Sequence, residues 1–300
     1  MITVLGSINL DLIGQVARFP APGETVAGTG FTSSPGGKGA NQALAARRAG
    51  SEVRLVGAVG DGQMGTAALE FLAADGVDLA SVHHLDGPQG TAMIMVDQRG
   101  ENIIGIFPGA NARLTDQDAD VAVRSMGHAD ILILQQEVPQ AATTRALELA
   151  RSRNIRSILN IAPFLETTPL VAKSADILIA NESEFALLAG QQPKNWDSAL
   201  DQWARSHKQT ILVTLGANGA IAASPDAVVH IPALEIEAID TVGAGDTFVG
   251  YFASGLDLGR GLTEAMRQGA VAASLACTRV GAQPSIPWAN AVANSWDAVK

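Results

Sequence analysis

Short apolar runs alternate with amphipathic stretches along most of the chain, and this alternation predicts the fold. Runs such as 131–134 and 177–179 are continuously apolar, which is typical of strands covered by helices on both faces. Between such runs lie segments with apolar positions three or four residues apart, which predict helices. The expected helices include 40–49, 116–126, 141–151 and 262–277, and the expected strands include 2–5, 53–59, 130–134, 157–160, 176–180 and 210–215. This order predicts an α/β fold with a doubly wound, mostly parallel sheet flanked by helices.

Two β-rich patches interrupt the alternation. Residues 18–34 are rich in Pro, Gly and Thr, and residues 90–107 hold two apolar runs around Gln98-Arg99-Gly100, which is a hairpin signal. We expect the patches to form a small β-sheet that closes over a site as a lid and excludes water, with an ordinary edge hairpin as the alternative. Residues 1–300 would then form a single α/β domain, with a lid made by insertions at about 12–34 and 90–107.

Composition narrows the expected partners and location. The formal net charge is −10 and no basic run occurs, so neither nucleic acid nor an anionic membrane is an expected partner. No apolar run approaches the length of a membrane span, and the N-terminus lacks the basic segment of a signal peptide. The single cysteine, Cys277, excludes an internal disulfide and is expected to be a small core residue. These features predict a cytoplasmic protein.

The segment 240–250, Asp-Thr-Val-Gly-Ala-Gly-Asp-Thr-Phe-Val-Gly, carries the most specific chemistry. It stands between an expected strand at 230–240 and an expected helix. Gly243 and Gly245 allow a sharp turn, and the free N–H groups at the start of the helix form an anion site. Asp246 lies within this site. Its negative charge would hinder phosphate binding, so a carboxylate here indicates a function of its own. We predict that Asp246 accepts the proton of a hydroxyl that attacks a phosphoryl group, although an Asp here is also a common helix cap.

Polar residues and glycines also follow the ends of several expected strands. Because the carboxyl ends of parallel strands share one edge of a sheet, we expect these residues to meet in a single crevice. Taken singly, each is explained equally well by a turn or a cap. The residues are Asn9, Asp11, Glu137, Asn160, Asn181, Glu184 and 214–219. The stretch 35–43, Pro-Gly-Gly-Lys-Gly-Ala-Asn-Gln-Ala, adds donors at Lys38 and Asn41, but its spacing is not that of a P-loop.

With these motifs in place, the chain resembles the ribokinase-like (PfkB) family of carbohydrate kinases over nearly its whole length. Residues 35–43 resemble the first family signature and residues 240–250 the second. Further similarity lies at 100–106, 109–111, 159–163 and 281–287. The resemblance implies an ATP-dependent sugar kinase that phosphorylates the primary O5 hydroxyl of D-ribose to give ribose 5-phosphate and ADP.

The resemblance also implies a role for each matching position. Asp246 would be the catalytic base, with Gly243, Ala244 and Gly245 as the anion hole. The sugar would bind Asn9, Asp11, Gly37, Lys38, Asn41, Glu137 and Asp246. ATP would bind Asn181, Glu184, Thr214, Leu215, Gly216, Ala217, Asn218, Gly219, Gly245 and Ala270, with Glu184 tied to Mg²⁺ and phosphate. A monovalent cation, with K⁺ expected, would be held largely by backbone carbonyls at Asp240, Val242, Ala276, Arg279, Gly281 and Ser285.

Two positions depart from the family pattern. Gly62 stands where many members have Asp, and Ala270 stands where a polar residue often lies beside the adenine. Both departures concern substrate choice and donor preference rather than the chemistry. Because the exposed lid sheet often pairs with another in this family, the resemblance implies a homodimer through the lid.

Three other functions are weighed against a ribose kinase. A nucleoside kinase, or a kinase of another sugar, is the alternative within the family; a nucleoside needs room and usually an aromatic surface, and none lies in 36–42. A catalytically silent sugar-binding regulatory protein would gain nothing from Asp246 beside bound phosphate. A dinucleotide-binding oxidoreductase is disfavoured, because no Gly-x-Gly-x-x-Gly follows the first strand.

Overall fold

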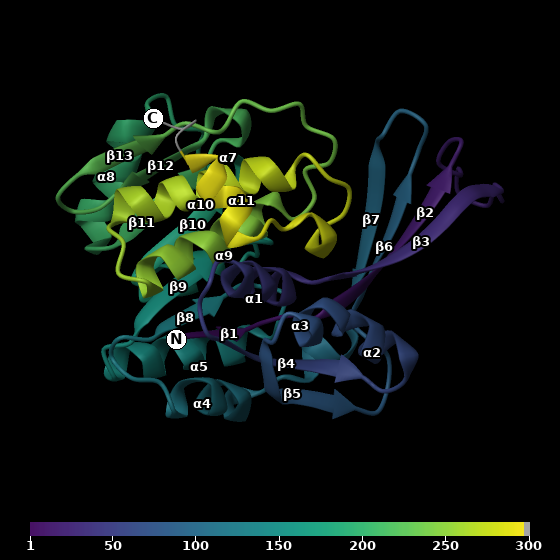
Figure 1. Cartoon of the computed structure of the whole chain (residues 1–300), viewed down its shortest axis with the longest axis horizontal. Helices are drawn as coiled ribbons and strands as arrows, with labels where there is room; N and C mark the ends of the chain where they lie inside the picture. Colours follow the sequence, from purple (N-terminus) through teal and green to yellow (C-terminus); the bar gives the residue numbers. More distant parts are fainter. Residues whose placement is uncertain (297–300) are drawn as a thin grey trace.

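A computed structural model describes residues 1–296 and contains a large sheet, a small sheet and helices packed around the large one (Figure 1). The strands of the large sheet are β1 (Ile2–Leu5), β4 (Val53–Gly60), β5 (Asp78–Leu85), β8 (Ile131–Leu134), β9 (Arg156–Asn160), β10 (Ile177–Asn181), β11 (Thr210–Thr214), β12 (Ala220–Ala223) and β13 (Val228–Ile231). Their order across the sheet is β13-β12-β11-β10-β9-β8-β1-β4-β5. Neighbours from β11 to β5 pair in parallel, whereas β12 and β13 form an antiparallel edge. The expected mostly parallel sheet is confirmed.

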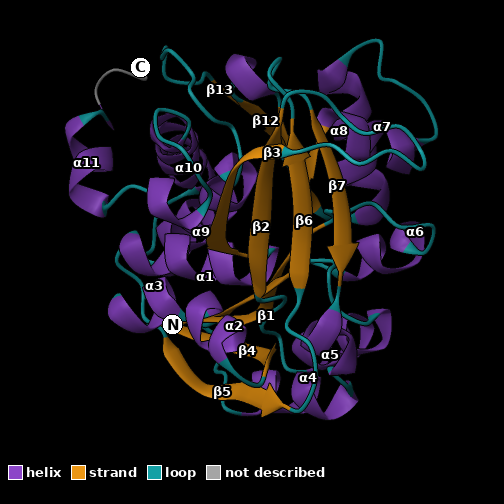
Figure 2. Ribbon diagram, turned by 90° about the vertical axis from the view of Figure 1, so that its right-hand side faces the viewer, coloured by secondary structure: helices purple, strands orange, loops and turns teal. Residues whose placement is uncertain are grey.

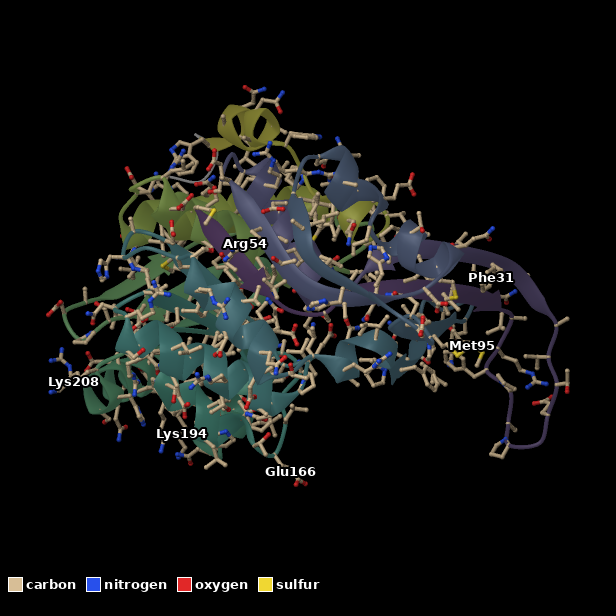
Figure 3. All side chains as sticks on the ribbon, turned by 90° about the horizontal axis from the view of Figure 1, so that it is seen from below. Phe31, Arg54, Met95, Glu166, Lys194 and Lys208 are labelled. Atoms are coloured by element: carbon tan, nitrogen blue, oxygen red, sulfur yellow. The ribbon has the colours of Figure 1, made fainter. Side chains whose placement is uncertain are left out.

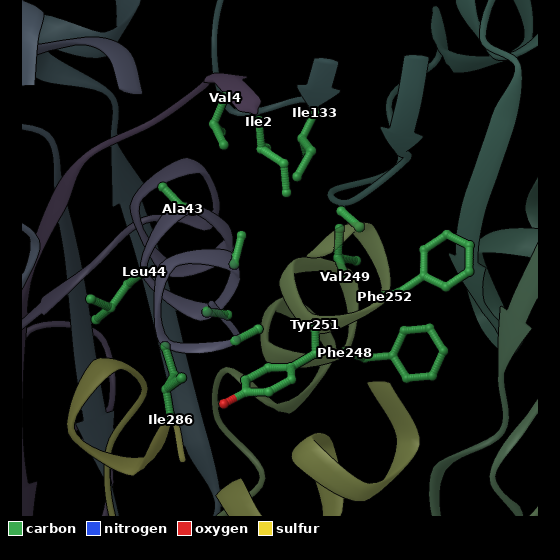
Figure 4. Close-up of a cluster of buried hydrophobic side chains, with 14 of the residues drawn as sticks. Ile2, Val4, Ala43, Leu44, Ile133, Phe248, Val249, Tyr251, Phe252 and Ile286 are labelled. Atoms are coloured by element: carbon green, nitrogen blue, oxygen red, sulfur yellow. The ribbon is translucent and has the colours of Figure 1, made fainter. Parts of the chain in front are cut away.

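Helices cover both faces of this sheet, as a doubly wound fold requires. Along β8, Ile133 packs into one hydrophobic core and Leu134 into a second, because successive side chains of a strand point to opposite faces. The first core includes α1 (Lys38–Arg48), α2 (Gln63–Ala68), α3 (Glu70–Ala74), α9 (Ala244–Asp257), α10 (Leu262–Ala276) and α11 (Ala289–Asn294). The second includes α4 (Asp116–Arg124), α5 (Gln140–Ser152), α6 (Thr168–Val171), α7 (Glu182–Ala189) and α8 (Trp196–His207). Figure 4 shows the first core, in which α1 and α9 lie side by side.

The two β-rich patches form the small sheet. Its strands are β2 (Asn9–Val16), β3 (Gly28–Gly36), β6 (Thr91–Val96) and β7 (Asn102–Phe107), in the order β3-β2-β6-β7. The sheet projects from the body of the molecule, and Phe31 and Met95 lie on this projecting part (Figures 1, 2 and 3). Its exposed large apolar side chains are Phe31, Met93, Ile103, Ile104, Ile106 and Phe107.

The structure corrects the expected strand at 230–240. The strand β13 ends at Ile231, and residues 232–239 form no strand. Beyond Ile231 the chain no longer pairs with β12, the neighbour of β13, and its backbone bonds to the end of helix α10 instead. The Leu234 N–H donates to Ser274 Oγ at 3.1 Å, and the Ile239 N–H donates to the Cys277 carbonyl at 2.8 Å. Its backbone groups therefore bond to helix α10 rather than to a sheet.

The positions of Asn9 and Asp11 also differ from the expectation that they end the first strand. The strand β1 stops at Leu5, and both residues belong to β2 of the small sheet. The turn between the strands requires Gly6, because a Cβ there would lie 2.7 Å from Gly39 Cα. Asn9 and Asp11 are therefore carried on the projecting sheet, which joins the large sheet at this turn.

Within residues 1–296, the structure contains no helix with the length and apolar character needed to cross a bilayer.

Candidate active site

Asp246 lies in the first turn of α9, and both of its carboxylate oxygens are held by side-chain amides. Asn41 Nδ2 donates to Oδ2 at 2.9 Å, and Gln42 Nε2 donates to Oδ1 at 2.8 Å. The side chain is only 7% exposed, so these bonds replace water around a buried charge. Both donors lie on α1, so the carboxylate is oriented by a neighbouring helix and not by capping its own.

Close packing of α1 against α9 makes these bonds possible. A Cβ at Gly250 would lie 2.5 Å from Ala45 Cβ and 2.6 Å from the Gln42 carbonyl oxygen, so glycine lets the two helices approach. At the start of α9, Gly243 has φ of 76°, a conformation that favours glycine. A Cβ at Gly245 would meet nothing within 4 Å. The N-terminus of α9 therefore faces open space directly beside Asp246.

A second group of carboxylates surrounds Lys38. Burial alone would lower the pKa of Lys38, but the nearby charges of Asp246, Glu137, Glu184 and Asp11 raise it. Lys38 therefore stays positively charged among four acidic side chains. This charge compensates part of their mutual repulsion at the centre of the site.

Asp11 and Glu137 form the acidic side of the site next to the small sheet. Burial, with the charges of Glu137 and Asp246, raises the pKa of Asp11 to about 7, while Lys38 acts against this shift. Glu137 Oε2 accepts hydrogen bonds from Ser7 Oγ at 2.6 Å and from the Lys38 backbone N–H at 3.0 Å. Glu137 is thus fixed in place. With its pKa near 7, the Asp11 carboxyl is only partly ionised at neutral pH.

Asn9 is held by a residue without a predicted role. Asn111 Nδ2 donates to Asn9 Oδ1 at 2.7 Å, and Asn111 Oδ1 accepts from the Ile8 N–H at 2.9 Å. A Cβ at Gly90 would lie 2.2 Å from Asn111 Nδ2, so this glycine provides the room for the amide. The similarity at 109–111 could have pointed to Asn111 from the sequence, but it does not show that Asn111 contacts Asn9.

Two adjoining cavities lie along the carboxyl ends of the strands. The smaller, of about 140 Å³, is lined by Lys38, Asn160, Ala162, Ile179, Ala180, Asn181, Glu184, Thr214, Gly243, Gly245, Asp246 and Val249. The larger, of about 440 Å³, is lined by Thr214, Gly216, Ala217, Gly219, Ala233, Leu234, Glu235, Ile236, Ala238, Thr241, Ala244, Gly245, Phe248, Ala270, Ala273, Ser274 and Cys277. Thr214 and Gly245 line both, so the cavities meet at the N-terminus of α9.

The cavities bring together most of the residues predicted to bind a nucleotide. Leu215 and Asn218 are exceptions, because they line neither cavity. Asn181 and Glu184 also cap α7: the Glu184 N–H donates to Asn181 Oδ1 at 2.8 Å, and the Asn181 N–H donates to Glu184 Oε2 at 2.9 Å. Burial first, and then the charge of Asp246, raises the pKa of Glu184.

Sequence reasoning missed the wall of the larger cavity at 233–238. The pattern at 230–240 predicted a strand and gave no reason to place these side chains in the wall of a cavity. The expectation of a core position for Cys277 was wrong, because the residue is partly exposed and lines the cavity at the end of α10. Burial, together with the charge of Asp240, raises the pKa of the Cys277 thiol. Cys277 is therefore a neutral wall residue.

Asp240 joins the two loops predicted to hold a cation. Its Oδ1 accepts from the Val242 N–H at 3.0 Å, and its Oδ2 accepts from the Gly281 N–H at 2.8 Å. Ser285 Oγ is directed to the Ala282 carbonyl at 2.8 Å. Among residues 1–296 no group of three or more His, Cys, Asp or Glu side chains is arranged so that it could hold a metal ion. Any ion between these loops would therefore depend on backbone carbonyls.

A buried carboxylate beside a helix N-terminus, at the junction of an apolar cavity and a polar one, is the arrangement of a phosphotransferase with an alcohol as acceptor. The chain matches the model of the pfkB family carbohydrate kinases over residues 1–289, and it belongs to that family. The family expected from the signatures is thus confirmed.

Similar proteins are ribokinases. A ribokinase from Bacillus subtilis is 36% identical over 294 residues, which cover 97% of this chain and 97% of the relative. A bifunctional ribokinase/ribose-5-phosphate isomerase A from Fructilactobacillus sanfranciscensis is 36% identical over 300 residues, which cover 98% of this chain and 55% of that longer protein. The structure of Arabidopsis thaliana ribokinase complexed with ribose and ATP superposes with a TM-score of 0.89 at 30% identity, and the match covers 98% of both chains. The expected fold is confirmed.

Proposed function

We propose that this chain transfers the terminal phosphoryl group of ATP to the O5 hydroxyl of D-ribose, giving ribose 5-phosphate and ADP. The observation that carries the proposal is Asp246, which is buried, fixed at both oxygens and placed where the two cavities meet. Relatives named as ribokinases supply the choice of ribose as substrate. The whole chain would act as one domain with the small sheet as its lid.

Asp246 would remove the proton from the sugar hydroxyl as its oxygen attacks the phosphoryl group. The backbone N–H groups of Gly243, Ala244 and Gly245 at the start of α9 would stabilise the charge that develops on the phosphoryl oxygens. Lys38 would contribute a positive charge between the two substrates. Positioning and charge stabilisation are the main sources of rate in phosphoryl transfer, and these residues supply both.

The polar side chains near the small sheet would hold the sugar. We assign its hydroxyl groups to Asn9, Asp11, Gly37, Lys38, Asn41 and Glu137. The lid would close over the sugar and keep water from taking the phosphoryl group. None of these assigned residues is aromatic, whereas a nucleoside would need a surface for its base, so this set of side chains favours a sugar over a nucleoside.

ATP would occupy the larger cavity, with its adenine against the apolar wall that includes Ala270 and its phosphates at the start of α9. The remaining nucleotide contacts are assigned to Asn181, Glu184 and 214–219. Glu184 fits a role toward Mg²⁺, because it offers the cavity a carboxylate oxygen, the donor type that this ion prefers. When bound, Mg²⁺ would neutralise phosphate charge.

A panel of acceptors tests this function. We expect ADP release in a coupled assay to depend on added D-ribose, and to be slower with 2-deoxy-D-ribose, hexoses and nucleosides. Preferred turnover of a nucleoside would contradict the sugar assignment. Absence of acceptor-dependent ADP release would support a silent binding protein instead.

The sugar affinity is expected to depend on pH through Asp11. Because the pKa of Asp11 is raised to about 7, the side chain is protonated below this pH and cannot accept two hydroxyl hydrogen bonds. The KM for ribose should therefore fall as the pH rises through about 7, with little change in the KM for ATP. In Asp11→Asn the ribose KM should stay high across this range. A parallel change in both KM values would indicate a general loss of structure in β2.

Activation by a monovalent cation follows from the loops joined by Asp240. An ion held there would brace the turn that begins α9, and so act on the anion site without touching the substrates. We expect kcat to rise when K⁺ replaces tetramethylammonium at constant ionic strength and fixed Mg-ATP, with Na⁺ less effective. Equal rates with all three cations would mean that the loops are packed turns without a functional ion.

We further propose a homodimer through the lid. The strand register places Phe31, Met93, Ile103 and Phe107 on one face of the small sheet, which a second copy would cover, and β7 is an edge strand with unpaired backbone groups.

A further inference from the structure

A chain of buried amides leads from the end of β8 to Asp246. Gln135 Nε2 donates to Gln42 Oε1 at 2.7 Å, and Gln42 Nε2 donates to Asp246 Oδ1 at 2.8 Å and to Asn160 Oδ1 at 3.1 Å. Gln42 and Gln135 are both 0% exposed. All hydrogen-bonding groups of the Gln42 amide are therefore used, and each has one partner.

These contacts determine which end of the Gln42 amide faces the carboxylate. If the amide turned over, its oxygen would face Asp246 Oδ1, and its NH₂ group would face the NH₂ group of Gln135. Asn160 favours the same orientation of the Gln42 amide. Its own Nδ2 donates to the Ile179 carbonyl at 3.2 Å, so its Oδ1 faces Gln42 and can only accept from the Gln42 NH₂ group. The bonds of Gln135 and Asn160 thus exclude the reversed amide.

Gln135 is placed here at a cost in hydrogen bonding. Its Oε1 is buried without a partner within the described residues, and a Cβ at Gly6 would lie 2.1 Å from that atom. A glycine therefore makes room for an amide that is only half satisfied. An apolar side chain of similar size would avoid the loss, so the donor that Gln135 gives to Gln42 is the feature that sets it apart.

The two oxygens of Asp246 are held differently. Oδ2 is bonded to Asn41, a proposed sugar ligand whose own Oδ1 is buried and has no partner within residues 1–296, so Asn41 keeps an acceptor for a sugar hydroxyl. Oδ1 is bonded to Gln42, which is 0% exposed and whose amide groups are all engaged by Asp246, Asn160 and Gln135. A bound sugar can compete for Asn41 but not for Gln42.

Resting on the proposed function, we propose that Gln135 and Gln42 are positioning residues for the catalytic base. They anchor Asp246 through Oδ1 and so leave Oδ2 as the oxygen that accepts the proton of the sugar hydroxyl. Gln135 acts only through Gln42, by fixing the direction of its amide. The proton moves from the hydroxyl to Oδ2, and no group on the amide chain changes its protonation.

Replacement of Gln135 by Met tests the proposal. We expect kcat to fall by roughly 10- to 100-fold, the range for misplacing a reacting group, with both KM values unchanged. Because Gln135 acts through Gln42, the double variant Gln42→Met/Gln135→Met should be no slower than Gln42→Met alone. If Gln135→Met does not fold, Gln135→Asn withdraws the amide by one methylene and should give the same loss of kcat.

Gln136→Met is the matched control. Gln136 is also buried, and its Oε1 likewise has no partner within the described residues, but its Nε2 donates to the Ile161 and Pro163 carbonyls and to Thr168 Oγ1, away from Asp246. It should lower the melting temperature more than Gln135→Met and leave kcat within about twofold of the wild type. A wild-type kcat for Gln135→Met, or an equal loss of kcat in both variants, would overturn the proposal. All variants are compared on the acceptor that the wild type turns over fastest, so preference for a sugar other than ribose would contradict only the proposed substrate.

Discussion

Replacing Asp246 by Asn is expected to lower kcat by about 10²–10⁴-fold, while the KM values for sugar and ATP change only a few-fold. The Asn side chain has nearly the same shape, but it cannot take the proton from the attacking hydroxyl. In addition, its NH₂ group would face one of the two amide donors that hold the carboxylate, Asn41 or Gln42. Steady-state kinetics with varied sugar and varied ATP separates the loss of kcat from any loss of binding.

Asp118→Asn provides the control for this variant. Asp118 has the same exposure of 7%, but it lines neither cavity. Its Oδ2 accepts hydrogen bonds from the backbone N–H and the Oγ1 of Thr115 in the capping box of α4. Its replacement should lower the free energy of unfolding by about 1 kcal/mol without changing kcat. Near-wild-type turnover in Asp246→Asn would remove this carboxylate from the mechanism.

Replacing Gly245 by Ala should have the next largest effect on activity and almost none on folding. The new methyl group would meet no atom of residues 1–296 within 4 Å, because Gly245 opens onto both cavities at the start of α9. We expect the free energy of unfolding to be unchanged or to rise by up to about 1 kcal/mol, since Ala favours a helix over Gly. The same methyl group would occupy the space where phosphate approaches the backbone, and kcat/KM for ATP should fall by roughly 10²-fold.

Gly261→Ala is the companion to this variant. Gly261 lies at the start of α10, where a Cβ would also meet nothing within 4 Å, but it lines neither cavity. It should leave kcat/KM unchanged. Thermal unfolding and ATP titrations on both variants give the comparison. If Gly245→Ala kept wild-type kcat/KM, the start of α9 would not be the phosphate site.

The parts of the fold that depend on local pattern could be predicted from the sequence. The strands β8 and β10 are apolar on both faces, and their continuous runs reveal that burial directly. The small sheet followed from turn residues and a hairpin signal. The strand expected at 230–240 failed because nothing local shows that β13 loses its partner after Ile231 and that the following backbone bonds to α10.

Part of the candidate site could also be predicted from local sequence, and part could not. Asp246 and its glycines form one short motif, so their chemistry is visible in the sequence. Gln42, Gln135 and Asn160 lie far apart in the chain, and their contacts with one another arise only from the packing of α1 against α9 and the sheet. A sequence signal exists in hindsight, because Gln42 is a polar residue within an otherwise alanine-rich buried stretch of α1. Its partner could not be read from that position.

The position of the phosphate on the product tests the central claim most directly. After incubation of the protein with D-ribose and Mg-ATP, the ³¹P spectrum of the sugar phosphate should show coupling to the protons of the C5 methylene group, and ADP should form in equal amount. A phosphate on O1, or release of inorganic phosphate without any sugar phosphate, would contradict transfer to the O5 hydroxyl by Asp246.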